Sequence, residues 1–533
     1  MTAMPEHPSQ NAVLFRRRLI VAAVILLLVA SAVAVTARDP GITWDEAIYV
    51  RYAVGYLDWF SSPDFSFAAL YPVWGLGQAH PPLGKLWIAL CLGFFGRMAD
   101  GITAVRLGAG LLFGGAAAAL YLWQAAVRNE RVGLLAAALF VLMPRLFAHG
   151  HFANLEMPML LLWLLTTIAF ERGIRDKRWS VACGALFGLA LLTKINALFL
   201  PVVLVPWGLL FHGRKALRNI IAMALLGPAL FFAGWPILWH HPIEGVRAYL
   251  ADKLDRATIP VHYLGRAYRE SAAPWHYPFV LLAATTPLPI LAAAAGGVAG
   301  ALRNIRTHWR ERAYVILLIW SAAFQVLLLA APGVPKYDGM RLMLPAVPFV
   351  AVLAAQGLEA AWLRLRGRVE NPRRAAWTAG TLLAVWLLLP VVWFHPLQLC
   401  YYSEPVGYPW GARVLGFETT YWNDTLTLEV VESVNREAPP NALVARVAVG
   451  SYVWPLYRAT GAVRKDLRDG DFDGGTWDVL IVVPRQGYWN DQQREFVERY
   501  EPNRTWTLTS LDALPTCMVY FRDRLQPRDS VTR

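Results

Sequence analysis

The sequence predicts a polytopic α-helical membrane protein, and three observations support this fold class. First, 56% of the 533 residues are hydrophobic and only 16% are charged, whereas soluble domains average about 25% charged residues. Second, about eleven apolar runs approach the roughly 20 residues that a helix needs to cross a bilayer. Third, the net charge of +13 is spread over short loops between these runs, unlike the single basic face of a nucleic-acid-binding protein.

The expected membrane spans alternate with basic loops in a regular way. Every basic loop falls on the side of the N-terminus, and the positive-inside rule places that side in the cytoplasm. This requires the apolar stretch 83–97, which is too short to cross, to lie along the interface. The first span is longer than the apolar core of a signal peptide, although Ser31–Ala34 resembles a cleavage site. The spans are expected near residues 14–36, 104–127, 132–149, 152–171, 179–195, 196–212, 217–238, 276–301, 313–331, 341–363 and 375–396, and the basic loops at 16–18, 128–131, 172–178, 214–218, 303–312 and 364–374.

Two units follow from this topology: a membrane domain over residues 1–396, whose first outward loop is 37–103, and an outward tail over 397–533. The tail alternates helical and strand patterns and predicts a small periplasmic α/β domain. Cys400 and Cys517 both lie in it, and a bridge between them is left open. The expected elements are a helix capped by Asn423–Asp424 that runs to Arg436, a helix over Asn490–Tyr500, and strands at Val444–Val449, Val479–Val483 and Met518–Phe521.

An acid pair follows the first span, in the segment Trp44-Asp45-Glu46. Adjacent carboxylates at a membrane interface suit general-base catalysis, or they can hold a divalent metal. The same residues also suit a helix N-terminus, with Thr43 as the cap and the acids favoured by the helix dipole. The two interpretations are compatible, because a capped helix fixes its first carboxylates in place.

Two cationic positions follow on the same side of the membrane. The segment His80-Pro81-Pro82-Leu83-Gly84-Lys85 predicts a helix start, which places Lys85 beside a lipid phosphate or leaves it reaching along the interface without a ligand. Arg106 opens the second span.

Further ionisable residues gather at the outward ends of later spans. Glu156 and Lys194 lie slightly within the membrane, where such groups often line a cavity and pair with each other. The turn Lys336–Arg341 contains Tyr337 and Asp338, and is either a simple connection or a second cationic phosphate contact through Arg341. The histidines His80, His149 and His151 lack the spacing of a zinc site, so no metal is expected from them.

These motifs resemble the GT-C class of membrane glycosyltransferases, and in particular the protein O-mannosyltransferase-like branch, glycosyltransferase family 39. They are also similar to the lipid A aminoarabinose transferases, which have Lys-Pro-Pro-Leu where this chain has His80–Leu83. The resemblance covers about residues 14–396, and the order of the short motifs makes it specific. The motifs are the acid pair, His80–Lys85, Arg106, Leu192–Asn196, Ala273–Pro278, Tyr337–Arg341 and Glu418–Trp422.

The resemblance implies transfer of a sugar from a polyprenyl phosphate to a lipid, glycan or protein acceptor on the non-cytoplasmic side, usually with inversion. By this resemblance Asp45 is the catalytic base and Glu46 is the second acid of the pair. Lys85 and Arg106 contact the donor phosphate or the frame of the active site, and Arg341 is the further candidate for a phosphate contact. His80, Glu156, Lys194, Tyr337 and Asp338 are the further candidates, with Glu156 standing where relatives more often have Asp. No cofactor is expected, although a divalent ion between Asp45 and Glu46 is the variant that related oligosaccharyltransferases use.

The alternatives to this enzyme are a transporter or flippase for a lipid-linked sugar, and an inactive assembly partner. A transporter is expected to show charges deep in several spans and internal symmetry. Here the polar residues gather at one end of the spans, which favours an enzyme. The expected partners are the lipid-linked donor, its acceptor and membrane lipids, and the expected location is the inner membrane of a bacterium.

Overall fold

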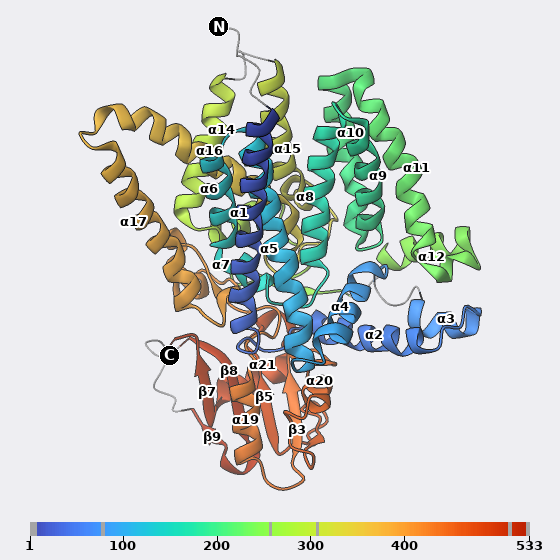
Figure 1. Cartoon of the computed structure of the whole chain (residues 1–533). Helices are drawn as coiled ribbons and strands as arrows, with labels where there is room; N and C mark the ends of the chain where they lie inside the picture. The colour runs from blue at the N-terminus through green and yellow to red at the C-terminus, as the bar shows by residue number, and fades with distance from the viewer. Residues whose placement is uncertain (1–7, 76–79, 255–257, 305–308, 510–513, 529–533) are drawn as a thin grey trace.

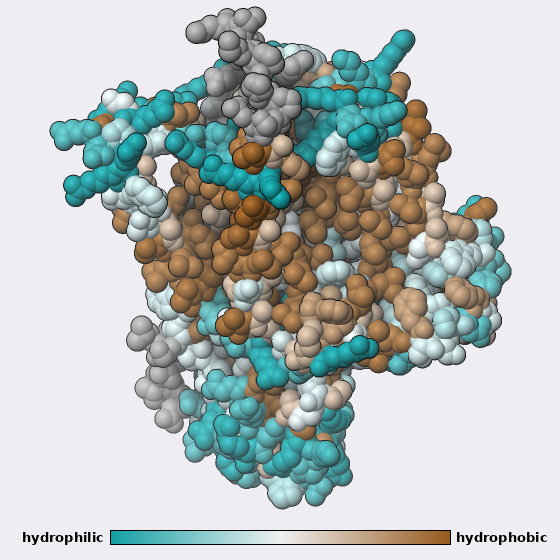
Figure 2. Space-filling model, viewed as in Figure 1, coloured by the Kyte–Doolittle hydropathy of each residue, from teal (hydrophilic) through white to brown (hydrophobic). Residues whose placement is uncertain are grey.

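The computed structural model describes residues 8–75, 80–254, 258–304, 309–509 and 514–528. A bundle of helices carries the C-terminal domain at one end, and the N-terminal end of α1 (Pro8–Val35) lies at the other end (Figure 1). On the face that Figure 2 shows, the side of the bundle is a band of apolar residues between two hydrophilic ends. Such a band is what a bilayer contacts, so the chain is a multi-pass membrane protein.

Among the described residues, six segments are long and apolar enough to cross a membrane, or up to seven if α13 (Tyr277–Thr285) and α14 (Leu288–Asn304) form one bent span. The bend of 117° occurs at Pro287, because proline drives the residue before it out of helical geometry. The predicted count of eleven stays a prediction, since several expected spans hold shorter helices. The six segments are Ala12–Val35, Gly101–Val127, Ile195–Ala233, Glu311–Ala330, Arg341–Arg368 and Pro372–Trp393.

Proline explains several of the shorter pieces. One helix of the bundle ends at Val141, and Pro144 begins the next, because proline is favoured in a first turn and disfavoured inside a helix. The remaining helices of the bundle are α5 (Gly101–Val127), α6 (Glu130–Val141), α7 (Pro144–His149), α8 (Glu156–Gly173), α9 (Lys177–Leu191), α10 (Leu200–His212), α11 (Leu217–Ala233), α15 (Trp309–Ala330), α16 (Val347–Leu365) and α17 (Pro372–Trp393). Short 3-10 turns η1 (Ile195–Phe199) and η4 (Arg341–Ala346) precede α10 and α16.

Several helices lie beside the bundle at the end that carries the C-terminal domain. Figure 1 shows α2 (Trp44–Ser61) and α3 (Phe67–Trp74) running across the base of the bundle. The expected interfacial stretch forms α4 (Leu83–Phe95), whose 13 residues are too few to cross a bilayer. The segment between α11 (Leu217–Ala233) and α13 contains α12 (Pro242–Leu254) and a hairpin of β1 (Pro260–Tyr263) with β2 (Arg266–Arg269).

The C-terminal domain contains a mixed sheet whose order, in the described part of the chain, is β4-β3-β5-β8-β7. Neighbours β4, β3 and β5 are parallel, whereas β8 is antiparallel to β5 and β7. Alternate residues of β5 enter separate hydrophobic clusters on the two faces of the sheet. The elements are α18 (Tyr408–Val414), α19 (Leu428–Glu437), β3 (Leu443–Val447), α20 (Val453–Ala459), β4 (Arg468–Asp469), β5 (Val479–Val482), α21 (Asp491–Arg499), β6 (Tyr500–Glu501), β7 (Arg504–Thr507), β8 (Pro515–Phe521) and β9 (Gln526–Pro527).

One expectation for the tail is wrong in detail. Helix α19 is capped by Thr427 instead of Asn423–Asp424. The reason is that the Asn423 side chain bonds the loop after β3, with Nδ2 donating to the Ala448 carbonyl at 2.6 Å and Oδ1 accepting from the Gly450 N–H at 3.1 Å. The sequence left a bridge between Cys400 and Cys517 open. Both side chains are buried in separate hydrophobic clusters and form no disulfide with each other.

Backbone contacts attach the loop before α19 to the segment that begins α2. The Gly41 N–H donates to the Asp424 carbonyl at 2.8 Å, and the Trp44 N–H donates to the Trp422 carbonyl at 3.0 Å. The Tyr457 hydroxyl of α20 also accepts from the Ile42 N–H at 2.9 Å. The C-terminal domain therefore helps to hold the start of α2 in place.

Candidate active site

The first turn of α2 presents Asp45 to the bundle. Thr43 is the N-cap, and its N–H donates to the Glu46 carboxylate at 3.3 Å. The amide dipoles of this turn favour negative charge. Burial raises the pKa of Asp45 above its usual value, although the positive charge of Arg341 opposes the shift. A carboxylate of raised basicity accepts a proton more readily than an ordinary surface aspartate.

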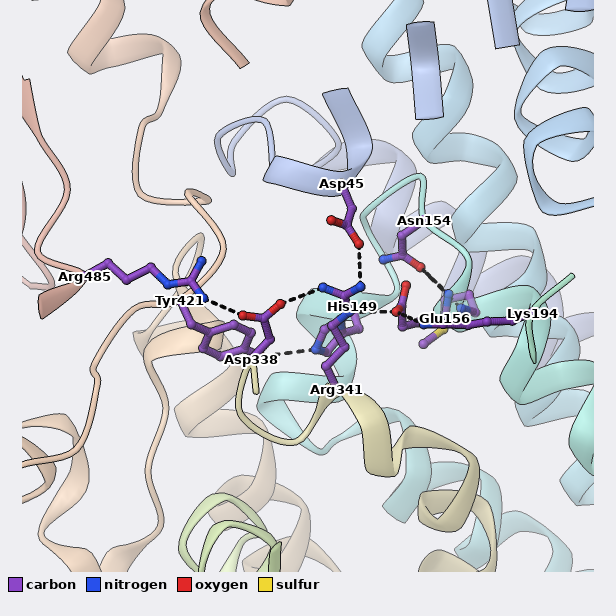
Figure 3. Close-up of polar contacts among 10 residues, drawn as sticks. Asp45, His149, Asn154, Glu156, Lys194, Asp338, Arg341, Tyr421 and Arg485 are labelled. Carbon is purple, nitrogen blue, oxygen red and sulfur yellow. Dashed lines mark hydrogen bonds and ion pairs between the residues drawn. The ribbon is translucent and has the colours of Figure 1, made fainter. Parts of the chain in front are cut away.

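Arg341, at the start of η4, joins three carboxylates (Figure 3). Its Nη2 donates to Asp45 Oδ2 at 2.5 Å, its Nε to Glu156 Oε1 at 2.7 Å, and its Nη1 to Asp338 Oδ2 at 2.7 Å. Three of the five guanidinium N–H groups are thus used, and two remain for another anion. The turn that presents Arg341 needs left-handed backbone at Asp338 and Gly339, which glycine adopts without cost.

Two further cations complete this network. Lys194 Nζ donates to Glu156 Oε1 at 2.7 Å, and Arg485 Nη2 from the C-terminal domain donates to Asp338 Oδ1 at 2.6 Å. Three carboxylates therefore face three cations, so the buried network is balanced in formal charge. Such balance offsets much of the cost of removing charges from water. No described residue bonds Asp45 Oδ1, which leaves this oxygen available to a substrate hydroxyl.

Several buried polar atoms beside the network lack a hydrogen-bond partner among the described residues. They include Glu156 Oε2, Asn154 Nδ2 and His149 Nδ1. The other ring nitrogen of His149, Nε2, lies 3.2 Å from the Tyr421 hydroxyl oxygen, within hydrogen-bond distance. Buried polar groups are usually satisfied, so acceptors and donors in this position suit a ligand with several hydroxyl groups.

Glu46 and Arg106 form a separate buried pair next to this network. Arg106 Nε and Nη2 donate to the two Glu46 oxygens at 2.9 and 2.7 Å, and Glu46 also accepts the Ala153 N–H at 3.0 Å. The remaining N–H groups of Arg106 donate to the carbonyls of Ala37, Pro40 and Gly41. All five N–H groups of Arg106 are used, so none is left for a donor phosphate. Of the two contacts that the motif left open for Arg106, this geometry favours the frame of the active site.

Lys85 is in the first turn of α4 and lies against α2, further along that helix than Asp45. Its Nζ donates to the His80 carbonyl at 2.7 Å and lies 5.1 Å from the ring centre of Tyr52 and 5.9 Å from that of Tyr56. Tyr52 and Tyr56 follow Asp45 by about two to three turns, or roughly 10 to 17 Å along the helix. The sequence-predicted residues thus share one end of the bundle, although Lys85 and His80 are not bonded to the Arg341 network. Tyr337 contributes a ring 5.8 Å from the Arg341 guanidinium.

A divalent ion shared by Asp45 and Glu46 does not fit this arrangement. Both Glu46 oxygens already accept two hydrogen bonds each, and Asp45 is paired with Arg341 instead. Within the described ranges, no cluster of three or more His, Cys, Asp or Glu side chains has the form of a metal site. We therefore derive no catalytic step through a metal ion.

Burial affects two acids of the loop that precedes α19. It raises the pKa of Glu418 to about 7, although the carboxylate accepts the Gly487 N–H at 3.2 Å. It also raises the pKa of Asp424 to about 7. Both groups lie where the loop packs between the bundle and the C-terminal domain, so their protonation affects how this interface is held.

We expect Glu418→Gln to reduce the pH dependence of thermal stability. The wild-type carboxyl group binds its proton more tightly in the folded state, near pH 7, than in the unfolded state, near pH 4.5. The free energy of unfolding of the wild type should therefore fall by about 3 kcal/mol as the pH rises through this window. Above the window it should level off. Melting temperatures of the detergent-solubilised protein, measured across the window, test this. Glu432→Gln, at an exposed position of α19, should keep the wild-type slope, and an unchanged slope in Glu418→Gln would contradict the assignment.

A family model and a curated relative each match part of the chain. Residues 79–239 match the family described as dolichyl-phosphate-mannose-protein mannosyltransferase. The undecaprenyl phosphate-alpha-4-amino-4-deoxy-L-arabinose arabinosyl transferase of Erwinia tasmaniensis is 28% identical over 267 residues, which cover 46% of this chain and 42% of that protein. The matched region therefore spans less than half of this curated relative.

Solved structures extend the likeness to most of the chain. The ArnT of Cupriavidus metallidurans, bound to undecaprenyl phosphate, is similar over 98% of this chain and 100% of its own, with a TM-score of 0.50 and 14% identity. The chain has a GT-C-class fold. The Archaeoglobus fulgidus oligosaccharyltransferase, tethered to an acceptor peptide, is similar over 84% of this chain and 64% of its own chain. Its TM-score is 0.50 and its identity is 12%. Together, these findings confirm the resemblance that the motifs indicated.

Sequence reasoning missed one member of the Arg341 network. Arg485 follows the predicted strand Val479–Val483, and no motif of the resemblance includes it. The available signal was its position after the carboxyl end of a strand with parallel pairing, where functional residues of α/β sheets often lie. Its partner Asp338 is 147 positions earlier in the chain, so only the folded structure connects them.

Proposed function

We propose that this GT-C protein transfers a sugar from a polyprenyl phosphate to an acceptor hydroxyl, with Asp45 as the general base. One observation carries the proposal: a half-buried aspartate, with one oxygen unbonded within the described chain, shares Arg341 with Glu156 and Asp338. This arrangement supplies a base and a cation within one hydrogen-bonded network, which is what an inverting transfer requires. The similarity to the undecaprenyl-phosphate-bound ArnT and to the arabinosyl transferase supports the class of donor.

In the proposed step, Asp45 removes the proton from the acceptor hydroxyl, and the resulting oxygen attacks the anomeric carbon of the sugar. The bond from that carbon to the donor phosphate breaks, and the phosphate leaves with the bonding electrons. The leaving group gains negative charge, which the free N–H groups of Arg341 and the ammonium of Lys85 stabilise. Attack from the face opposite the phosphate gives inversion at the anomeric carbon.

In this proposal Glu46 and Arg106 do not contact the substrate; they hold Asp45 in position. Their ion pair fixes the turn that holds Asp45, because Arg106 also bonds the carbonyls of the preceding segment. Glu156, Lys194 and Asp338 hold Arg341, and the unbonded atoms near Glu156 face the sugar hydroxyls. His80 positions Lys85 through its carbonyl oxygen, and Tyr337 borders Arg341.

The comparisons support a transferase over a transporter, since the relatives that match are transferases of lipid-linked sugars. The proposal covers hexose and pentose donors, and lipid, glycan and protein acceptors; an assay with each donor and acceptor distinguishes them. We propose the inner membrane as the location, eleven crossings, a cytoplasmic N-terminus and a periplasmic C-terminal domain. The basic loops support this orientation through the positive-inside rule; of the loop 303–312, residues 305–308 lie outside the described residues.

The decisive experiment measures sugar transfer by the purified protein in detergent. Undecaprenyl phosphates that carry mannose or aminoarabinose are incubated with a membrane extract as the source of acceptor, and the loss of the lipid-linked sugar is followed. A detergent micelle has no two compartments, so a transporter gives no net reaction. Release of undecaprenyl phosphate supports the transferase, whereas intact donors across a panel of hexoses and pentoses would contradict it.

A pair of lysine variants in the same assay tests the phosphate contact. Lys85→Met should raise the donor KM by about tenfold, since charged hydrogen bonds contribute about 1.5–3 kcal/mol, with a smaller effect on the acceptor KM. Lys336→Met is the matched control, because this buried lysine bonds the carbonyls of Ala331 and Val334 at the end of α15. Equal donor KM values in both variants would remove Lys85 from the donor site.

A further inference from the structure

A cavity lies among the ends of α5, α14, α15 and α16. Figure 1 shows α14, α15 and α16 reaching the end of the bundle opposite the C-terminal domain. Its volume is about 440 Å³, which is in the range of small-molecule sites. Its wall is mixed, with apolar side chains such as Val132, Val315 and Leu363 and with four charged residues. An amphiphilic cavity at the edge of a membrane domain suits the polar part of a lipid.

Two glycines of α14 create the space for this cavity. A Cβ added at Gly296 or Gly300 would meet no heavy atom within 4 Å, although both positions line the cavity. Gly297, between them, is different, because its Cβ would lie 2.1 Å from the Leu353 carbonyl oxygen of α16. Helix packing therefore explains the glycine at 297, whereas the glycines at 296 and 300 leave room for a ligand at a cost in helix propensity.

The cavity carries both signs of charge. Arg128 is bonded to Glu311 and lies 4.9 Å from the ring centre of Tyr314. Glu359 and Arg364, both on α16, form no hydrogen bond or ion pair with any described residue, and Glu359 is half-buried. A half-buried carboxylate without a partner favours an incoming cation, and Arg364 favours an anion.

One lining residue, Gln356, belongs to a polar cluster that also contains Tyr314 and Gln124. The Tyr314 hydroxyl donates to Gln124 Oε1 at 2.7 Å, and Gln356 Nε2 donates to the Tyr314 oxygen at 3.2 Å. Gln124 Nε2 is buried without a hydrogen-bond partner among the described residues. Gln356 itself lines the cavity, so its amide group is placed to bond the polar backbone of a bound molecule.

We propose that this cavity binds the headgroup of a phospholipid that carries a phosphate and a primary amine. Arg364 contacts the phosphate, Glu359 contacts the ammonium, and the acyl chains leave along the apolar wall. The balance of two acids and two arginines in the lining favours a zwitterionic headgroup over a purely anionic one. The bound lipid would belong to the leaflet opposite the active site. The proposal does not depend on the proposed transferase function.

Native mass spectrometry of the purified protein in detergent tests this site, with phosphatidylethanolamine and phosphatidylglycerol of identical acyl chains added in equal amounts. The wild type should retain the ethanolamine lipid in about two- to fivefold excess, as one partly exposed ion pair provides. Glu359→Gln should bring this ratio close to one. Gly296→Leu combined with Gly300→Leu should lower retained phosphatidylethanolamine to the background of the detergent.

Gly380→Leu is the matched control for the paired glycine variant. Gly380 lies in α17, where an added Cβ also meets nothing, but it is not part of the cavity lining. This variant should retain lipid as the wild type does. Three results would overturn the proposal: equal retention of both lipids by the wild type, a preference for phosphatidylglycerol, or unchanged retention in the paired glycine variant with a wild-type melting temperature.

Discussion

Asp45→Asn is expected to lower the turnover number for sugar transfer by about 10³-fold, the middle of the range for general-base catalysis. The asparagine keeps the size of the side chain, and its carbonyl oxygen still accepts from Arg341. The proton acceptor alone is lost, so the donor KM should change by less than about threefold. Initial rates of donor loss at saturating acceptor measure both quantities.

The pH profile separates a lost base from a distorted site. If Asp45 is the base, wild-type turnover falls as the pH drops through the Asp45 pKa, which burial raises above its usual value. The residual activity of Asp45→Asn should not show this decline. Asp100→Asn is the control, because Asp100 caps α5 at the same end of the bundle, and asparagine caps a helix equally well. Wild-type turnover in Asp45→Asn would exclude the proposed base.

The sequence predicted much of the site because topology restricts where polar residues lie. Asp45, Glu156, Lys194 and Arg341 all follow or precede apolar runs, so alternation of crossings places them at one end of the bundle. At that end the structure joins them into one network through Arg341. Residues that are far apart in the chain can thus be grouped by side, without knowledge of how the helices pack.

What the sequence could not show is which neighbour each side chain faces. Asp45 and Glu46 are adjacent, but successive helix residues point about 100° apart. Asp45 therefore reaches Arg341, while Glu46 reaches Arg106. The number of crossings was uncertain for a related reason, since helices such as α6 and α9, with 12 and 15 residues, are shorter than the apolar runs that suggested them.

Replacing Arg106 should destabilise the protein more than any other single change discussed above. The Glu46 and Arg106 side chains are 0% and 1% exposed, and removing one partner of such a pair costs about 3–5 kcal/mol. Arg106→Met should therefore lower the melting temperature strongly, since it leaves the Glu46 charge and three carbonyl groups without their donor. The measurement is heat-induced unfolding of the protein in detergent, with Arg38→Met as the control. Arg38 pairs with Asp100 at the surface, where it is 64% exposed, and such pairs contribute at most about 1 kcal/mol.

A double-mutant cycle decides between a structural role for Arg106 and the phosphate contact that the motif left open. If the ion pair is structural, Glu46→Gln combined with Arg106→Met should cost less than the sum of the two single changes, because neither buried charge is then left alone. Donor KM in the surviving folded protein should stay within about threefold of the wild type, since all five N–H groups of Arg106 point at protein oxygens. A donor KM that rises about tenfold in Arg106→Met with little loss of melting temperature would instead assign Arg106 to the lipid phosphate, and the turn before α2 would then need another anchor.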